Sequence, residues 1–301
     1  MSKAVERLIT KMNDVGLSDG SIKLYLQRLT KLNGDKPPKS FLYLKKVEDI
    51  MERMNDLKKN TKESYLGSII TILKLLPKKT YEPSLNKYKN RLEILRGEIK
   101  EEPKSTSETI TKEKLDKLKE EYMEGSRAIT GKTIGKKDYN LIIHNLLLSL
   151  YTDIPPRRNQ DFLFMKITND YDKEADKNDF NWYDKKNKRF IFNKYKTAKS
   201  YGEQVIDIKK NKPLLSALKI YLKYRKQNEN WLLVKWSGEN YKQVNDITRE
   251  LHKVFGEKVG STKLRHLYVS DKYGEINKEQ QADAKAMGHS VSTQQSVYND
   301  N

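Results

Sequence analysis

Apolar residues in the first third of the chain recur every three to four positions, the spacing of one face of an α-helix. Leu8 and Met12 mark a first amphipathic helix that stops at Gly16, and Ser18 is a suitable cap for a second. Two prolines at 37 and 38 then break the pattern. Three more helices are expected over 47–57, from 60 to 77, and over 83–100. Residues 1–100 are therefore predicted to form an all-helical domain.

A polar and charged stretch at 101–110 has no periodic apolar face and is typical of an interdomain linker. Beyond it, a strongly apolar helix over 139–151 is predicted to be the centre of a second core. The expected strands cover 180–183, 189–192 and 204–208, and the expected helices start at Thr111 and later cover 213–226, 241–255, 261–273, 277–287 and 292–298. Residues 111–301 are therefore predicted to form an α+β domain with a small antiparallel sheet.

The charge balance favours a polyanionic partner. The chain has 60 Lys and Arg against 41 Asp and Glu, a net charge of +19 over 301 residues. Neutralising phosphates releases counterions, which favours binding to nucleic acid. A lysine-rich composition inherited from an AT-rich genome explains the same excess equally well, and charge alone does not separate DNA from RNA.

The cysteine, histidine and apolar content of the chain limits which kinds of site and location are expected. Without cysteine, disulfides and Cys-based metal sites are excluded, and a cytosolic or nuclear location is compatible. The four histidines have no ligand spacing, so a metal site is not expected. The first residues contain no apolar signal core, and no apolar run approaches the length of a membrane span.

The most informative segment is 287–298, which reads MGHSVSTQQSVY and places Tyr298 nine positions after His289. A phenol near a His and an Arg can attack a phosphodiester, because tyrosine supplies a nucleophile and the cation stabilises the extra charge on the phosphate. This segment closely resembles the C-terminal box of tyrosine recombinases, the lambda-integrase family. The resemblance implies that Tyr298 is the nucleophile and that His289 hydrogen-bonds the scissile phosphate.

Upstream positions extend the resemblance. The family carries a first Arg in a motif like R-x-x-E/D-L after a buried helix, and Arg158 with Asp161 matches it. The resemblance makes Arg158 a phosphate-clamping residue supported by Asp161. Pro-Pro stands where Thr-Gly is usual, as in integrase-like recombinases of large eukaryotic DNA viruses and related mobile elements. Taken alone, this segment would be a basic helix start at the surface.

The family also places a lysine on a β-hairpin, where it acts as general acid. Lys196 lies between two predicted strands and is the preferred candidate, with Lys194 and Lys199 as competitors. Without the other motifs, a lysine at such a place would be a solvated charge. The candidate therefore depends on the resemblance as a whole.

The second family box, H/K-x-x-R, ends at Arg265 in this chain. Its first position is Thr262, which can hydrogen-bond a phosphate oxygen but exchanges a proton poorly near neutral pH. Either Lys263 supplies that function or the enzyme works without it. His266 is expected to have a structural role. Each match is weak alone, and only the five candidate positions in order carry the resemblance.

The implied reaction needs no cofactor and no metal. Arg158 and Arg265 would stabilise the transition state with His289, Tyr298 would form a 3′-phosphotyrosine, and Lys196 would protonate the leaving 5′-oxygen. The implied function is a site-specific recombinase or integrase that cleaves and rejoins duplex DNA. Residues 1–100 match the family only in type, as a helical core-binding domain that closes a C-shaped clamp around the duplex.

Two alternatives remain open. A type IB topoisomerase has a similar active site, although the 24 positions between Arg265 and His289 favour a recombinase. A DNA-binding protein with a decayed active site is suggested by Thr262. Three residues follow Tyr298, too few for a swapped C-terminal helix. The protein is expected to be a monomer or weak oligomer that forms a homo-tetramer on DNA, away from membranes, in the host nucleus or cytoplasm.

Overall fold

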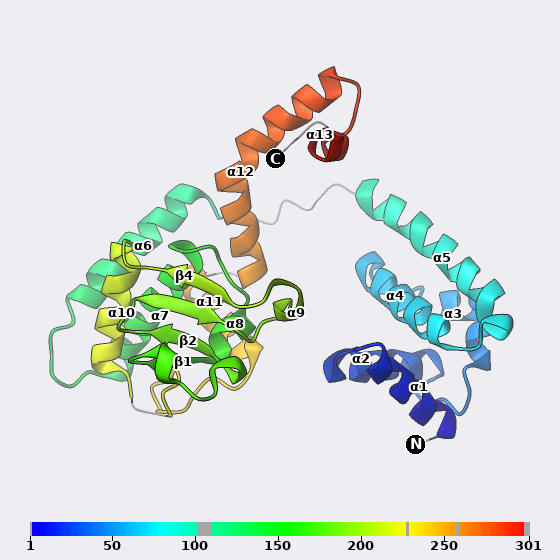
Figure 1. Cartoon of the computed structure of the whole chain (residues 1–301), viewed down its shortest axis with the longest axis horizontal. Coiled ribbons are helices and arrows are strands. Elements are labelled where there is room, and N and C mark those ends of the chain that lie inside the picture. Colours follow the sequence, from blue (N-terminus) through cyan, green and yellow to red (C-terminus); the bar gives the residue numbers. More distant parts are fainter. Residues whose placement is uncertain (1, 102–109, 227–228, 257–258, 298–301) are drawn as a thin grey trace. The chain divides into compact units, whose positions relative to one another are not determined.

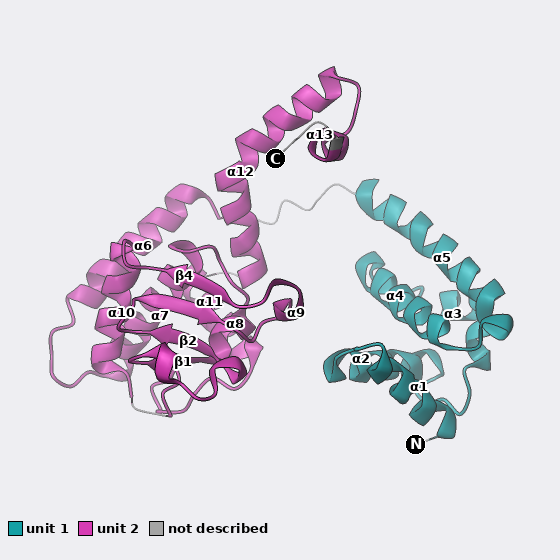
Figure 2. Ribbon diagram, in the orientation of Figure 1, with its two compact units in different colours: residues 1–107 teal, residues 108–301 magenta. Residues whose placement is uncertain are grey.

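The computed structural model describes residues 2–101, 110–226, 229–256 and 259–297. The chain divides into two compact units, residues 1–107 and 108–301 (Figure 2). The predicted linker at 101–110 lies almost wholly outside the described residues. None of the helices in the described ranges is both long and apolar enough to span a membrane.

The first unit is helical throughout its described residues (Figure 1). Ser18 caps the second helix by accepting a hydrogen bond from the Ser21 N–H, and Gly16 ends the preceding turn with φ of 75°. Both boundaries agree with the sequence. The elements are α1 (Lys3–Asp14), α2 (Asp19–Leu32), the short 3-10 helix η1 (Leu42–Lys45), α3 (Val47–Glu52), α4 (Lys59–Leu75) and α5 (Lys78–Glu101).

Three expected boundaries in this unit are wrong. Helix α3 ends at Glu52 rather than at residue 57, and α4 ends at Leu75 rather than at residue 77. Helix α5 begins at Lys78 and contains Pro83, where the sequence placed its start. The carbonyl that Pro83 leaves without a donor belongs to Lys79 in the first turn, so the helix accommodates this proline near its beginning.

The core of the first unit joins its long helices to the segment before α3. Helices α4 and α5 pack along each other, with Leu66 and Ile72 fully buried. Tyr88 on α5 is also fully buried, and its hydroxyl donates to the carbonyl of Leu44, 2.9 Å away. This bond satisfies both polar groups and fixes α5 to η1.

The second unit contains helices and one small sheet (Figure 1). Thr111 caps its first helix by accepting from the Lys114 N–H, as the sequence predicts. Its helices are α6 (Lys112–Arg127), α7 (Lys136–Thr152), α8 (Asn159–Leu163), α9 (Ala198–Tyr201), α10 (Lys212–Tyr224), α11 (Val244–Phe255), α12 (Ser261–Ala286) and α13 (Val291–Val297).

The sheet has four strands in the order β1-β2-β3-β4: β1 (Met165–Thr168), β2 (Asn181–Asp184), β3 (Arg189–Phe192) and β4 (Gln204–Asp207). The three predicted strands are confirmed. The sheet is mixed rather than purely antiparallel, because β1 pairs in parallel with β2. Strand β1 was missed because its four residues, MKIT, are too few to show an alternating pattern.

Each face of the sheet packs against a different part of the unit. Tyr183, Phe190 and Phe192 join the main core with α7, whereas Trp182 and Ile191 point to the opposite face. This alternation follows from the two-residue period of a strand. The second face is covered by the crossover from β1 to β2, which contains the short 3-10 helices η2 (Tyr171–Lys173) and η3 (Lys177–Asp179).

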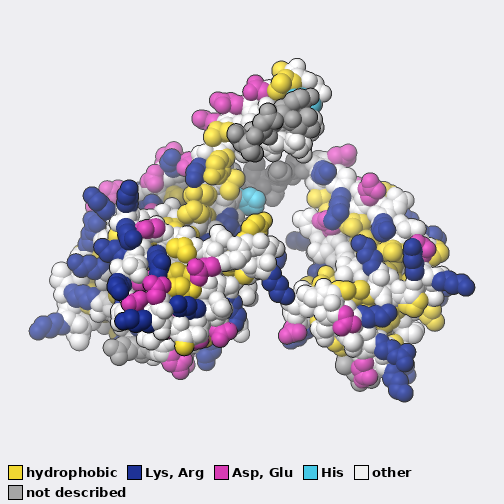
Figure 3. All heavy atoms as spheres, in the orientation of Figure 1, with side chains coloured by type: hydrophobic (Ala, Val, Ile, Leu, Met, Phe, Trp, Pro, Cys, Tyr) yellow, Lys and Arg dark blue, Asp and Glu magenta, His cyan; other side chains and the backbone are white. Residues whose placement is uncertain are grey.

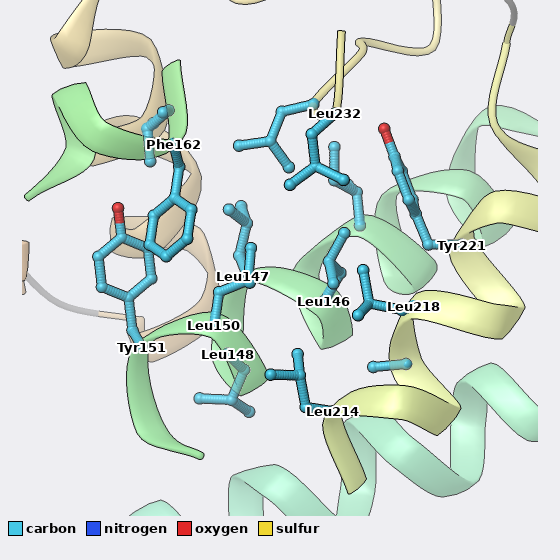
Figure 4. Packing of buried hydrophobic residues seen from close by; sticks show 14 of the residues in the cluster. Leu146, Leu147, Leu148, Leu150, Tyr151, Phe162, Leu214, Leu218, Tyr221 and Leu232 are labelled. Atoms are coloured by element: carbon cyan, nitrogen blue, oxygen red, sulfur yellow. The ribbon is translucent and has the colours of Figure 1, made fainter. Parts of the chain in front are cut away.

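Helix α7 is the centre of the main core, as its apolar sequence predicts. Every residue from Ile142 to Tyr151 is buried. Figure 4 shows Leu146, Leu147 and Leu150 of this helix between Phe162 of α8 and Leu218 of α10. The last turn of α7 therefore lies beside α8, the element that begins at the predicted Arg158 position.

Helix α12 corrects the expectation of two helices over 261–273 and 277–287, since it is continuous from Ser261 to Ala286. Leu264 is buried against the core, whereas Tyr273, pointing about 180° away from Leu264 on the helix, is exposed. The apolar face thus changes direction near Gly274, and this change suggested a break. A single glycine costs a helix only about 1 kcal/mol, so the backbone continues.

Candidate functional site

The first candidate arginine lies where the chain passes from α7 to α8. Pro155 and Pro156 cannot continue a helix, and α8 begins at Asn159 with Arg158 as its N-cap residue. The Arg158 side chain is half-buried. Within the described part of the chain, its guanidinium makes no hydrogen bond or ion pair, so it is available to an anion.

Asp161 supports Arg157 rather than Arg158. The Arg157 Nε donates to the Asp161 Oδ2 over 3.0 Å, and only 2% of the Asp161 side chain is exposed. Burial raises the pKa of Asp161, and the charge of Arg157 opposes that rise. Arg158 meets Asp161 through the backbone, where its carbonyl accepts from the Asp161 N–H.

Arg265 lies in the first turns of α12 and reaches the same region. Its Nε donates to the Ser261 carbonyl and its Nη2 to the Thr262 hydroxyl, each over 3.3 Å. Its charge also acts on the buried hydroxyl of Tyr151. Burial raises the pKa of Tyr151, Asp161 raises it further, and Arg265 lowers it.

Tyr151 connects the two candidate arginines. Its hydroxyl donates to the Asn159 Oδ1 over 2.6 Å, and the Asn159 amide donates to the Thr248 hydroxyl over 2.9 Å. Asn159 is buried and directly follows Arg158 in the chain. The end of α7 and the starts of α8 and α12 therefore meet at Tyr151, which places Arg158 and Arg265 in one region.

The candidate lysines lie between β3 and β4, an antiparallel pair, as the hairpin prediction requires. Their connection, residues 193–203, contains the short helix α9. The Lys194 Nζ lies 5.6 Å from the centre of the Phe164 ring. Lys196 is exposed and, among the described residues, forms no hydrogen bond or ion pair, while Lys199 lies on α9. Lys196 is thus more available than Lys194.

Thr262 is exposed and accepts a hydrogen bond from Arg265. In this position it orients the arginine side chain rather than supplying a group that titrates near neutral pH. Lys263 is half-buried and His266 is exposed, both on the same turn of α12.

His289 lies in the turn that joins α12 to α13. Gly288 has φ of 73°, and the His289 N–H donates to the Ala284 carbonyl over 3.0 Å, which ends α12 with a left-handed cap. Ser290 then caps α13 by accepting from the Thr293 N–H over 3.1 Å. The local structure agrees with the predicted helix start after the histidine.

The structure does not bring His289 to the arginines. Arg265 is the fifth residue of α12 and His289 follows its last turn, so at 1.5 Å per residue the two are about 30 Å apart. Figure 1 shows α12 projecting from the body of the unit with α13 beside its far end. Tyr298, the predicted nucleophile, lies outside the described residues. Arg158 and Arg265 are therefore grouped around α8, and His289 is separate. The connection that carries Lys196 reaches this region through Tyr195, whose ring lies 4.7 Å from the Arg157 Cζ.

Comparisons with known proteins were made with the whole chain. No protein-family model and no curated protein sequence matches it. A solved structure described as the crystal structure of XerA recombinase is similar over 99% of this chain and 95% of its own, with 14% identity and a TM-score of 0.36. This weak likeness identifies neither a family nor an activity. The interpretation depends on the motifs and on the geometry around α8.

Three residues in this region were not singled out from the sequence as parts of a site: Arg157, Asn159 and Tyr151. Arg157 and Asp161 have the four-residue spacing of an ion pair, and this signal could have been found although Arg157 precedes α8. The bond between Tyr151 and Asn159 joins two helices across a proline turn, and no local pattern predicts it. No group of three His, Asp or Glu in the described ranges could hold a metal ion.

Proposed function

We propose that this chain is a tyrosine recombinase that cleaves and rejoins duplex DNA through a covalent 3′-phosphotyrosine. The observation that carries the proposal is the grouping of Arg158, Arg265 and the Lys196 connection around the start of α8. These residues are distant in sequence and were selected from motifs alone. Their convergence supports a common site for a phosphate group.

The reaction follows from the chemistry of these groups. Arg158 and Arg265 would bind the non-bridging phosphate oxygens with forked donors and stabilise the charge of the pentacoordinate transition state. The Tyr298 hydroxyl would lose its proton to solvent, its oxygen would attack the phosphorus, and the bond to the 5′-oxygen would break. Lys196 would give its proton to that oxygen. Rejoining reverses these steps, so the energy of the phosphodiester is conserved in the protein–DNA bond.

The described conformation would precede assembly of the complete site. A phosphate that both Arg265 and His289 contact must lie about 3 Å from each side chain. Helix α12 holds these residues at opposite ends, so the segment carrying His289 and Tyr298 would have to move toward α8. Duplex DNA is the partner that would supply the binding energy for that movement.

Charge supports DNA as the partner of both units. Residues 1–107 carry 23 Lys and Arg against 14 Asp and Glu, and residues 108–301 carry 37 against 27. Lys and Arg side chains are spread over the visible faces of both units (Figure 3). The helical unit would therefore contribute phosphate contacts that position the enzyme. We place its action in the host nucleus or cytoplasm, for a viral or other mobile element, as a tetramer on DNA.

A second candidate function is DNA binding without cleavage. Thr262 favours it, because the hydroxyl donates and accepts hydrogen bonds without changing charge near neutral pH and is already bonded to Arg265. The separation of Arg265 and His289 is consistent with either function. The two differ in whether a covalent adduct forms.

The deciding experiment uses a pool of nicked duplexes of random sequence, in which cleavage near the nick traps the protein on DNA. Adducts that survive denaturation are collected without metal or ATP, and the attached residue is identified by peptide mass spectrometry. Tyr298 should carry the DNA, Tyr298→Phe should give none, and Tyr273→Phe should react normally. An adduct on Tyr268 or Tyr273 would contradict the assignment, and no adduct would favour the binding protein.

The same preparation separates a recombinase from a topoisomerase. A topoisomerase acts as a monomer and should relax any supercoiled plasmid at low protein concentration. A recombinase requires paired sites and more than one protomer, so strand exchange should rise steeply with concentration. Efficient relaxation without strand exchange would support the topoisomerase alternative.

A further inference from the structure

The Arg157 guanidinium lies against two aromatic rings, one at the end of β3 and one in the connection that follows β3. Its Cζ lies 4.2 Å from the centre of the Phe192 ring and 4.7 Å from that of Tyr195. Phe192 is the last residue of β3, and Tyr195 is the neighbour of Lys196 in the connection to β4. In the plane of the guanidinium, Nε donates to Asp161 on α8. Arg157 therefore joins the start of α8 to the segment that carries Lys196.

Two further contacts fix that segment. The Tyr195 hydroxyl donates to the Gly202 carbonyl over 2.8 Å, which closes residues 195–202 into a compact loop. The fully buried Asn181 side chain donates to the Asp161 carbonyl over 2.7 Å and accepts from the Lys194 N–H over 2.8 Å. The base of the loop is thus tied to α8 by Asn181. The ring beside Lys196 is tied to α8 by Arg157.

We propose that Arg157 is a positioning residue, which sets Lys196 relative to Arg158 for protonation of the leaving 5′-oxygen. This inference rests on the proposed function. Arg157 would not touch the DNA. It would hold Tyr195 in place, and Tyr195 would hold the backbone from which Lys196 extends. Without that hold, an exposed lysine with many rotamers would seldom present its proton at the required place.

Arginine is required for this arrangement. A planar guanidinium can stack on aromatic rings while its edge donates to a carboxylate, and a lysine ammonium cannot do both. Arg157→Lys would keep the positive charge beside Asp161 and lose the stacking. It therefore distinguishes positioning through Tyr195 from simple neutralisation of Asp161.

Chemistry at the leaving group provides the test. A substrate with sulfur in place of the bridging 5′-oxygen releases a thiol whose pKa is about 8.5, so it leaves without a proton from the enzyme. Loss of the general acid should therefore slow cleavage of the oxygen substrate and leave the rate of cleavage of the sulfur substrate unchanged. Loss of a phosphate clamp should slow both, because the charge on the non-bridging oxygens develops in either case.

The variants are chosen to keep the fold. Arg157→Met leaves Asp161 buried without its partner, so it is combined with Asp161→Asn to remove the charge. Tyr195→Leu removes one ring and keeps the pair of Arg157 with Asp161. Lys196→Ala and Arg158→Ala are the reference variants, and thermal unfolding is recorded for each.

We expect the Arg157→Met/Asp161→Asn variant to cleave the oxygen substrate about 100-fold more slowly than wild type and the sulfur substrate at nearly the wild-type rate. Tyr195→Leu, Arg157→Lys and Lys196→Ala should show the same pattern, with Arg158→Ala slow on both. If the Arg157 and Tyr195 variants slowed cleavage of both substrates equally, or slowed neither, this inference would be overturned and the proposed function would stand. A wild-type chain that forms no adduct with either substrate would overturn the proposed function as well.

Discussion

Arg265 and His289 lie at opposite ends of α12, and a continuous helix keeps them about 30 Å apart. The two belong to one reaction centre only if the chain between them bends. The change of apolar face at Gly274 marks where a bend would disturb the fewest contacts. The half of α12 before it packs on the core, and Val269, Tyr273 and Ile276 around it are exposed.

Substituting Gly274 by Ala tests that bend. An added Cβ would meet nothing within 4 Å, so alanine should stabilise the continuous helix by about 1 kcal/mol. If α12 must unwind there before reaction, adduct formation should slow by about 5-fold with DNA binding unchanged. Gly67→Ala, at an equally open position within α4, is the matched control and should not affect the rate. An unchanged rate in Gly274→Ala would place the movement elsewhere.

The arginines should act on cleavage more than on binding. Arg158→Ala and Arg265→Ala should each reduce the rate of adduct formation by about 10²–10³-fold, the effect of removing one donor to developing charge. Duplex affinity should fall only slightly, because each variant removes one cation from a net charge of +19. Rates come from single-turnover cleavage and affinities from fluorescence anisotropy. A parallel loss of both would indicate a binding role instead.

Affinity for duplex DNA should depend steeply on salt. If six or more phosphates are contacted, raising salt from 50 to 200 mM should weaken binding by about 1,000-fold or more. The fragment 108–301 should show a smaller salt slope than the full chain, since residues 1–107 have their own positive excess. Identical slopes would show that the helical unit does not contribute phosphate contacts.

Lowering the pH should reduce the stability of the second unit, because Glu250 becomes protonated. Burial raises the pKa of this carboxyl, but hydrogen bonds from His144, 2.8 Å away, and Lys253 outweigh burial and hold the pKa below its usual value. Because the folded pKa is lowered, the stabilisation is present above pH about 4.5 and is lost as the pH falls below it. Glu250→Gln should lower stability by about 1 kcal/mol at pH 7 and reduce the loss on acidification. Urea denaturation at pH 7 and pH 4 measures both effects, with exposed Glu279→Gln as control.

Local signals in the sequence predicted much of the fold. Ser18 and Thr111 were expected helix caps and are caps, because their hydroxyls satisfy free N–H groups wherever a helix begins. The long apolar run of α7 predicted a buried helix, because burial removes apolar side chains from water. The parallel strand β1 was not predictable, since its partner follows a crossover of twelve residues and its own pattern is short.

The candidate site was predictable in part. Arg158, Lys196 and Arg265 were chosen from motifs, and the contacts of Tyr151 and Tyr195 bring their surroundings together. The separate place of His289 was not predictable. The change of apolar face suggested a break between two helices, whereas the backbone of residues 270–280 continues as one helix. The exact partner of Asp161 was missed since two adjacent arginines compete for it, and the aromatic rings select Arg157.

The second half of α12 buries only one side chain, that of Ala284. A helical segment with so little buried apolar area has a small free energy of local opening, far below that of the unit as a whole. Its amides should exchange with solvent deuterium well before those of α7 in the core. The half of α12 after Gly274 should thus open locally without disturbing the half that bears Arg265.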